Sequence, residues 1–266
     1  MIDKKFIEPP EQMRAMIVLL PCMGGNIMTY RYPAKDWEKN GFGILYFNPP
    51  GHGKSVGIFN FENTLTLLKK EIDSILDKHG DNLALIGIGH SGGGSSLLKL
   101  FDLNPGYNLQ KLFLLSPILD TARSLHELYS RNNIGEFIKS LQLTDSRIIQ
   151  IISTDSWLDE RYWKENDLKN RINRYSEETS SASKLGTFLE NLFIPTKRVY
   201  SCLEHLHEKT VLFFPTEDNW YPIEDGVRIA EKYDFPYFTI AKANNHFFRN
   251  AWKDVSKKIE SILLGD

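Results

Sequence analysis

The sequence has little cysteine, little net charge and no long apolar run. Its two cysteines, Cys22 and Cys202, are too few and too far apart for a disulfide framework or a thiolate metal site. The net charge of −2 gives no electrostatic basis for binding nucleic acid or an anionic membrane. No apolar run reaches the length of a bilayer span, and the first residues lack the apolar core of a secretory signal. We therefore expect a cytoplasmic protein with no membrane span and no nucleic-acid partner.

The sequence does contain a regular alternation of apolar runs and segments with helical spacing. At 266 residues, with 41% apolar and 25% charged residues, it suits one α/β domain that carries an insertion. The apolar runs predict buried strands at residues 15–20, 43–47, 83–88, 111–116, 210–214 and 237–240. The helix-periodic segments between and after them are 30–39, 64–79, 95–103, 224–233 and 250–264. This order predicts a mostly parallel sheet with helices on both faces and functional loops at the carboxyl ends of the strands.

Residues 120–207 interrupt the alternation. They are polar and helix-periodic, carry several aromatic residues and contain no clear buried strand. We interpret this segment as a helical cap inserted into a core made of residues 1–119 and 208–266. The amino-terminal edge of the sheet is left open between one short strand and none, because only 14 residues precede the first parallel strand.

One stretch, residues 83–95, places a serine between a strand and a helix. Within it, Gly89-His90-Ser91-Gly92-Gly93 fits the pattern G-x-S-x-G. A Cβ atom at Gly89 or Gly93 would clash where strand and helix pack closely, so the turn pushes the Ser91 hydroxyl out over the end of the sheet. The amides that open the helix point at any oxyanion formed there. Ser91 is therefore the candidate nucleophile.

Two nucleotide-binding patterns overlap these residues. Residues 87–92 also match G-x-G-x-x-G, the dinucleotide fingerprint, but the strand at 111–116 ends in Ser-Pro rather than in the acidic residue that would hold a ribose. Residues 53–55, Gly-Lys-Ser, resemble the end of a phosphate-binding loop, but such a loop needs glycine where Asn48 stands. We favour neither interpretation.

A serine nucleophile requires a histidine base and an anionic residue that orients the base. In a sheet of this kind the three follow one another as Ser, Asp and His at successive strand ends. Asp218 and His246 occupy the loops after the next-to-last and last predicted strands. Glu217 and Asn219 adjoin Asp218 and are alternatives if the loop register is shifted.

Four local motifs make the chain resemble the α/β-hydrolase superfamily, in particular its capped serine esterase, lipase and peptidase branch. They are the elbow at 89–93, Asn48-x-x-Gly-His-Gly-x-Ser55, Pro215-x-x-Asp218 with Pro222, and Ala243-x-x-His246. The second has asparagine for the family's aspartate, and the third has proline for its glycine. Where the family commonly has H-G-x-G-G in its oxyanion loop, this chain has Pro-Cys-Met-Gly-Gly at 21–25.

The resemblance implies an α/β-hydrolase fold and acyl transfer to water without a cofactor. Ser91 would attack a carbonyl, with His246 as the base and Asp218 orienting it. The backbone amides of Met23 and Gly92 would hold the oxyanion, because that role depends on the backbone and not on the side chain.

The remaining candidates concern substrate contacts and loop structure. Trp220 follows the acid and is a candidate pocket residue, and Cys22 of the oxyanion loop is a second one. A buried structural thiol is a commoner use of such a cysteine than catalysis. We expect His52 and His90 to structure their loops rather than to act as bases.

The sequence leaves several substrate classes open. An aromatic-rich cap favours an ester of a small or medium apolar acyl group, as for a carboxylesterase or a monoglyceride lipase. A thioesterase would use the same residues. A peptidase would need acidic cap residues for a free amino terminus, for which the candidates are Asp155, Asp159, Glu160 and Glu165. A non-hydrolytic ligand-binding protein or lyase of the same fold is the alternative from another class. The sequence does not indicate an oligomeric state.

Overall fold

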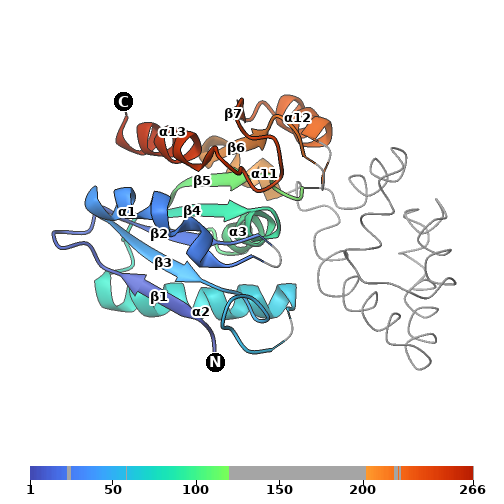
Figure 1. The fold of residues 1–266 in the computed structure, drawn as a ribbon. Helices are drawn as coiled ribbons and strands as arrows, with labels where there is room; N and C mark the ends of the chain where they lie inside the picture. The colour runs from blue at the N-terminus through green and yellow to red at the C-terminus, as the bar shows by residue number, and fades with distance from the viewer. Residues whose placement is uncertain (23–24, 58, 120–201, 219–220, 222, 266) are drawn as a thin grey trace, which may run out of the picture.

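In the computed structural model of the chain, residues 1–22, 25–57, 59–119, 202–218, 221 and 223–265 are described. Within these ranges seven strands form one sheet in the order β1-β3-β2-β4-β5-β6-β7 (Figure 1). The strands are β1 (Lys4–Ile7), β2 (Ala15–Leu20), β3 (Phe42–Phe47), β4 (Leu85–His90), β5 (Leu109–Leu115), β6 (Thr210–Pro215) and β7 (Tyr237–Ile240). The helices are η1 (Ile27–Tyr30), α1 (Arg31–Lys39), α2 (Phe61–His79), α3 (Gly92–Leu103), α11 (Leu203–Leu206), η5 (His207–Lys209), α12 (Ile223–Lys232) and α13 (Trp252–Leu264).

The strands contribute side chains to two hydrophobic cores, one on each face of the sheet. In β2, Met16, Val18 and Leu20 join the core that α2, α3 and α12 cover, whereas Ile17 and Leu19 join the core beneath α1 and α13. Every residue of β2 is buried, as a parallel strand covered on both faces requires. All neighbouring strands from β3 to β7 pair in parallel. The predicted mostly parallel sheet with helices on both faces is confirmed.

Several predicted elements have shifted ends. The strand expected at 83–88 lies two residues later, because His90 still pairs with Leu115 at the end of β5. The helix expected at 95 begins at Gly92, where close packing requires the glycines that weaken helix propensity. Likewise α2 begins at Phe61, after Asn60 caps it by accepting a hydrogen bond from a first-turn amide.

The amino-terminal edge of the sheet carries one short strand, β1, which pairs antiparallel with β3. Of the predicted cap, residues 120–207, the structure describes only 202–207. The division into core and cap therefore stays a prediction. Among the described residues, no helix combines the length and the apolar character that crossing a bilayer demands.

Candidate active site

The elbow holds Ser91 in a strained backbone conformation, with φ 53° and ψ −123°. A non-glycine residue in such a conformation costs about 1–3 kcal/mol, so the surrounding structure has to impose it. The amide of Ser91 donates a hydrogen bond of 2.8 Å to the carbonyl of Leu115, which fixes the turn against β5. A Cβ atom at Gly89 would lie 2.6 Å from the Cα of Gly94. A Cβ atom at Gly93 would lie 2.3 Å from the carbonyl oxygen of Pro21, the residue after β2. The predicted close packing at both glycines is confirmed.

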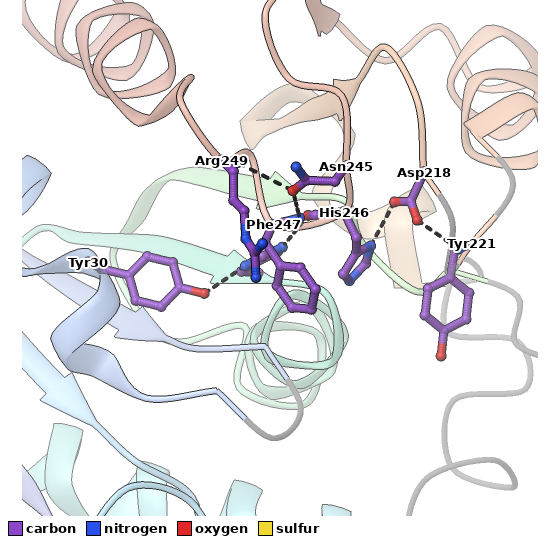
Figure 2. A network of polar contacts seen from close by, with 8 residues as sticks. Tyr30, Asp218, Tyr221, Asn245, His246, Phe247 and Arg249 are labelled. Carbon is purple, nitrogen blue, oxygen red and sulfur yellow. Dashed lines mark hydrogen bonds and ion pairs between the residues drawn. The ribbon is translucent and has the colours of Figure 1, made fainter. Parts of the chain in front are cut away.

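The loops after β6 and β7 bring an acid and a base together. His246 Nδ1 lies 2.7 Å from Asp218 Oδ2, and both side chains are at most 4% exposed. The second carboxylate oxygen, Oδ1, accepts a 2.9 Å hydrogen bond from the amide of Tyr221 (Figure 2). Because Nδ1 donates to the carboxylate, the Nε2 atom of a neutral His246 keeps a free lone pair that can accept a proton.

Not every predicted site residue can be located. Met23 and residues 219–220, which include the predicted oxyanion donor and pocket tryptophan, lie outside the described residues. Glu217 is exposed, and it is Asp218 that contacts His246. Within the described part of the chain, no group of three or more His, Cys, Asp or Glu residues could hold a metal ion.

A buried hydrogen-bond chain runs through His90, the residue before Ser91. His90 Nε2 lies 2.8 Å from the carbonyl oxygen of His246, and its Nδ1 lies 2.6 Å from the hydroxyl of Tyr30. A carbonyl only accepts, so Nε2 carries the proton and Nδ1 accepts from Tyr30. The Tyr30 hydroxyl in turn accepts from the Cys22 amide at 3.3 Å. This chain of hydrogen bonds connects the loop after β2, the elbow and the loop that carries His246.

His90 is held in its neutral form. Burial first, and the nearby His246 second, lower the pKa of His90 to about 3. The two rings lie 5.2 Å apart between centroids. Because His90 is neutral, it places no positive charge beside the ring of His246.

Cys22 is buried, and burial raises the pKa of its thiol. A higher pKa leaves less thiolate at neutral pH, which argues against a nucleophilic role. The Cys22 side chain instead lines a cavity beside the elbow. Sequence reasoning had no signal for Tyr30 as the partner of this loop, because its pattern only marked the start of a helix.

The loop after β3 explains the asparagine at the position where the resembling family has aspartate. Asn48 Oδ1 accepts from the amide of Ile27 at 3.0 Å, and its Nδ2 donates to Asp3 Oδ2 at 2.7 Å. The same Asp3 oxygen accepts from the amide of Lys54 at 3.0 Å, and the Asp3 amide donates to Ser55 Oγ at 2.8 Å. The carboxylate of this network is therefore supplied by Asp3, near the amino terminus.

Comparisons with known proteins agree with this architecture. A family model described as "Serine aminopeptidase, S33" matches residues 11–176, a range that includes Ser91 and ends before Asp218 and His246. The protein phosphatase methylesterase 1 of Candida albicans is 26% identical over 153 residues, which are 56% of this chain and 41% of that protein. The match thus spans less than half of that relative's length.

Solved structures share the fold over almost the whole chain. A thermostable carboxyl esterase from Bacillus coagulans superposes with a TM-score of 0.63 at 14% identity, covering 99% of this chain and 94% of the esterase. A monoacylglycerol lipase from Paleococcus ferrophilus superposes with a TM-score of 0.54 at 17% identity, covering 98% and 99%. These identities are low, so the likeness concerns the fold.

Proposed function

The chain belongs to the serine aminopeptidase S33 family of α/β-hydrolases, and within this family we propose that it hydrolyses a carboxylic ester of a small or medium apolar acyl group. The observation that carries the proposal is the 2.7 Å contact between His246 Nδ1 and Asp218 Oδ2. The loop that carries His246 is bonded to His90, directly before the strained Ser91. An orienting acid, a base and a serine at one edge of the sheet are what acyl transfer needs.

In the first half of the reaction, Ser91 Oγ attacks the carbonyl carbon of the ester and its proton passes to His246 Nε2. Asp218 stabilises the imidazolium that forms. The amide of Gly92 opens α3, so it has no partner inside the helix and can donate to the oxyanion. The amide of Met23 is the second proposed donor. The tetrahedral intermediate then collapses, and His246 gives its proton to the departing alcohol.

In the second half, water attacks the acyl group bound to Ser91. His246 takes a proton from the water, and the second tetrahedral intermediate uses the same oxyanion donors. Collapse breaks the bond to Ser91 Oγ, and the proton returns from His246 to the serine. The products are the carboxylic acid and the regenerated enzyme.

The first test is labelling with a fluorophosphonate serine probe, followed by intact-mass measurement. The wild type should gain one adduct, Ser91→Ala should gain none, and Ser74→Ala should label like the wild type because Ser74 is an exposed residue of α2. A folded wild type that does not label would contradict an activated serine.

The second test compares substrate classes on the same three proteins. A chain-length series of nitrophenyl esters should be turned over, with an optimum at short or medium chains. Faster turnover of matched acyl thioesters would replace the ester assignment by a thioesterase. Preferential cleavage of aminoacyl arylamides would indicate a peptidase. Binding of ester without turnover, unchanged in Ser91→Ala, would indicate a ligand-binding protein.

A further inference from the structure

A cavity of about 540 Å³ opens beside the elbow. Its size falls within the range usual for small-molecule sites. Its described lining includes Cys22, His90 and Phe247, whereas Ser91 and His246 themselves are not among the lining residues. These residues are the chain neighbours of the proposed oxyanion donor, nucleophile and base. A substrate bound to the proposed machinery therefore has this cavity next to its scissile bond.

Three of the nine described lining residues are aromatic, and the imidazole of His90 is a fourth ring. Tyr30, Phe247 and Trp252 contribute rings, and the rings of Tyr30 and Trp252 meet edge to face with centroids 5.0 Å apart. Such a wall suits an apolar chain or ring. The imidazole of His90 adds no charge, because burial lowers its pKa to about 3 and both ring nitrogens are bonded to neighbouring groups.

Arg249 brings the one formal charge found among the described residues that line the cavity. Arg249 lines the cavity together with Phe247 and Tyr30, and all three side chains are drawn in Figure 2. No aspartate or glutamate is among the described lining residues, and Asp254, five positions further along the chain than Arg249, pairs with Lys242 at 3.4 Å. Across the described ranges, the recorded ion pairs leave the Arg249 guanidinium without a carboxylate partner.

The loop that carries Arg249 is held in an unusual path. Asn245 Oδ1 accepts from the amides of Phe247 at 3.0 Å and Arg249 at 3.4 Å. On either side of Arg249, Phe248 and Asn250 adopt the left-handed region, with φ values of 52° and 65°. Such residues cost free energy, which the fold has to offset elsewhere. The strained path places Arg249, an exposed residue, on the cavity wall three residues after the proposed base.

We propose that this cavity binds a carboxylate carried by the substrate, with Arg249 as its partner, so that the preferred esters contain a carboxylate beside the scissile bond. The inference rests on the proposed function for the position of the scissile bond. A guanidinium offers paired N–H donors that match the two oxygens of a carboxylate. The aromatic wall accommodates the apolar chain between the two groups. The substrate class is thus an apolar ester with one anionic end.

Paired esters test this inference. Monomethyl esters of straight-chain dicarboxylic acids place the carboxylate on the acyl side, and acetyl esters of ω-hydroxy acids place it on the alcohol side. Each is compared with the neutral ester of equal length. In the series that places the carboxylate on the correct side, the wild type should turn over the anionic ester with a kcat/KM about tenfold higher than that for the neutral ester. About tenfold is the lower end of what a charged hydrogen-bonded pair contributes. Added salt should reduce this preference.

Variants assign the preference to Arg249. The ratio of kcat/KM for the anionic ester to kcat/KM for the neutral ester should fall to about one in Arg249→Gln. It should be partly kept in Arg249→Lys, which retains the charge but loses the paired donors. Lys253→Gln removes one positive charge from the exposed face of α13 and should keep the wild-type ratio. A wild-type ratio near one in both arms, or a ratio unchanged in Arg249→Gln, would overturn the inference while ester hydrolysis by Ser91 stands.

Failure of the proposed function gives a different result. If the wild type turns over neither the anionic nor the neutral esters, the ester assignment fails, and glutarate is titrated calorimetrically onto Ser91→Ala. Heat of binding that disappears in Ser91→Ala with Arg249→Gln would support the carboxylate site. Absence of binding heat in Ser91→Ala would overturn it.

Discussion

Acid should destabilise the protein through one buried imidazole, that of His90. This residue is 1% exposed, and its pKa is lowered from 6.5 to about 3 by burial and by the neighbouring His246. Between these two values the unfolded chain binds a proton at His90 and the folded protein does not. The free energy of unfolding therefore falls as the pH falls through this window, and the full contribution is present only above the unfolded pKa.

The magnitude follows from the width of the window. Each pH unit below the unfolded pKa costs about 1.4 kcal/mol until the folded pKa is reached. Between pH 7 and about pH 5, His90 alone should remove about 2 kcal/mol of stability. The whole window amounts to about 5 kcal/mol, as much as the total stability of a marginal domain.

Urea unfolding of the wild type and His90→Gln at both pH values isolates this contribution. Glutamine does not titrate, and all other groups are common to both proteins, so the stability gap between them should shrink by about 2 kcal/mol at the lower pH. Tyr30→Phe is the matched control: it removes the bond to Nδ1 but leaves the imidazole buried, so it should lower stability at both pH values and keep the wild-type pH dependence. A gap between the wild type and His90→Gln that is equal at both pH values would refute the reasoning.

Three further predictions concern packing, the Asp3 network and catalysis. Gly93→Ala should lower the urea midpoint severely, because its Cβ would lie 2.3 Å from a backbone oxygen, whereas Gly106→Ala, with nothing within 4 Å, should shift the urea midpoint little. Asn48→Asp should lower the free energy of unfolding by about 1–2 kcal/mol, because it places two carboxylates together. Adding Asp3→Asn should restore most of that stability. If the effects of the two substitutions simply add, the contact is contradicted. Asp218→Asn should keep the circular-dichroism spectrum and lower kcat on nitrophenyl esters by about 10⁴-fold, and a loss below tenfold would argue against its role.

The fold was predictable because a strand that is buried on both faces of a sheet is a continuous apolar run in the sequence. The run 15–20 coincides with β2, and the runs before Asp218 and His246 coincide with β6 and β7 to within a residue. The beginning of α3 was wrong by three residues, because glycine propensity argues against a helix there and close packing overrides it. Strand ends were also displaced where pairing continues past the apolar run, as at His90.

The site was predictable in part, for a different reason. The order of Ser91, Asp218 and His246 along the chain follows from the parallel topology, which brings strand ends to one edge, and the contact between Asp218 and His246 agrees with it. Contacts of Tyr30 with His90 and of Asp3 with Asn48 join residues 60 and 45 positions apart. Neither contact has a periodic signal, because the strand and helix repeats say which face a residue lies on but not which distant residue it meets at the end of an element.

The chemistry of the elbow explains why a neutral imidazole suits the position before Ser91. The side chain at that position makes two hydrogen bonds. The Nε2 atom of His90 donates to the carbonyl of His246, and its Nδ1 atom accepts from the hydroxyl of Tyr30. A permanently charged side chain 5.2 Å from the ring of His246 would oppose the forming imidazolium by about 3 kcal/mol at an effective dielectric constant of about 20. Burial therefore keeps the connecting histidine neutral, so that His90 bonds to both groups without placing a positive charge beside His246.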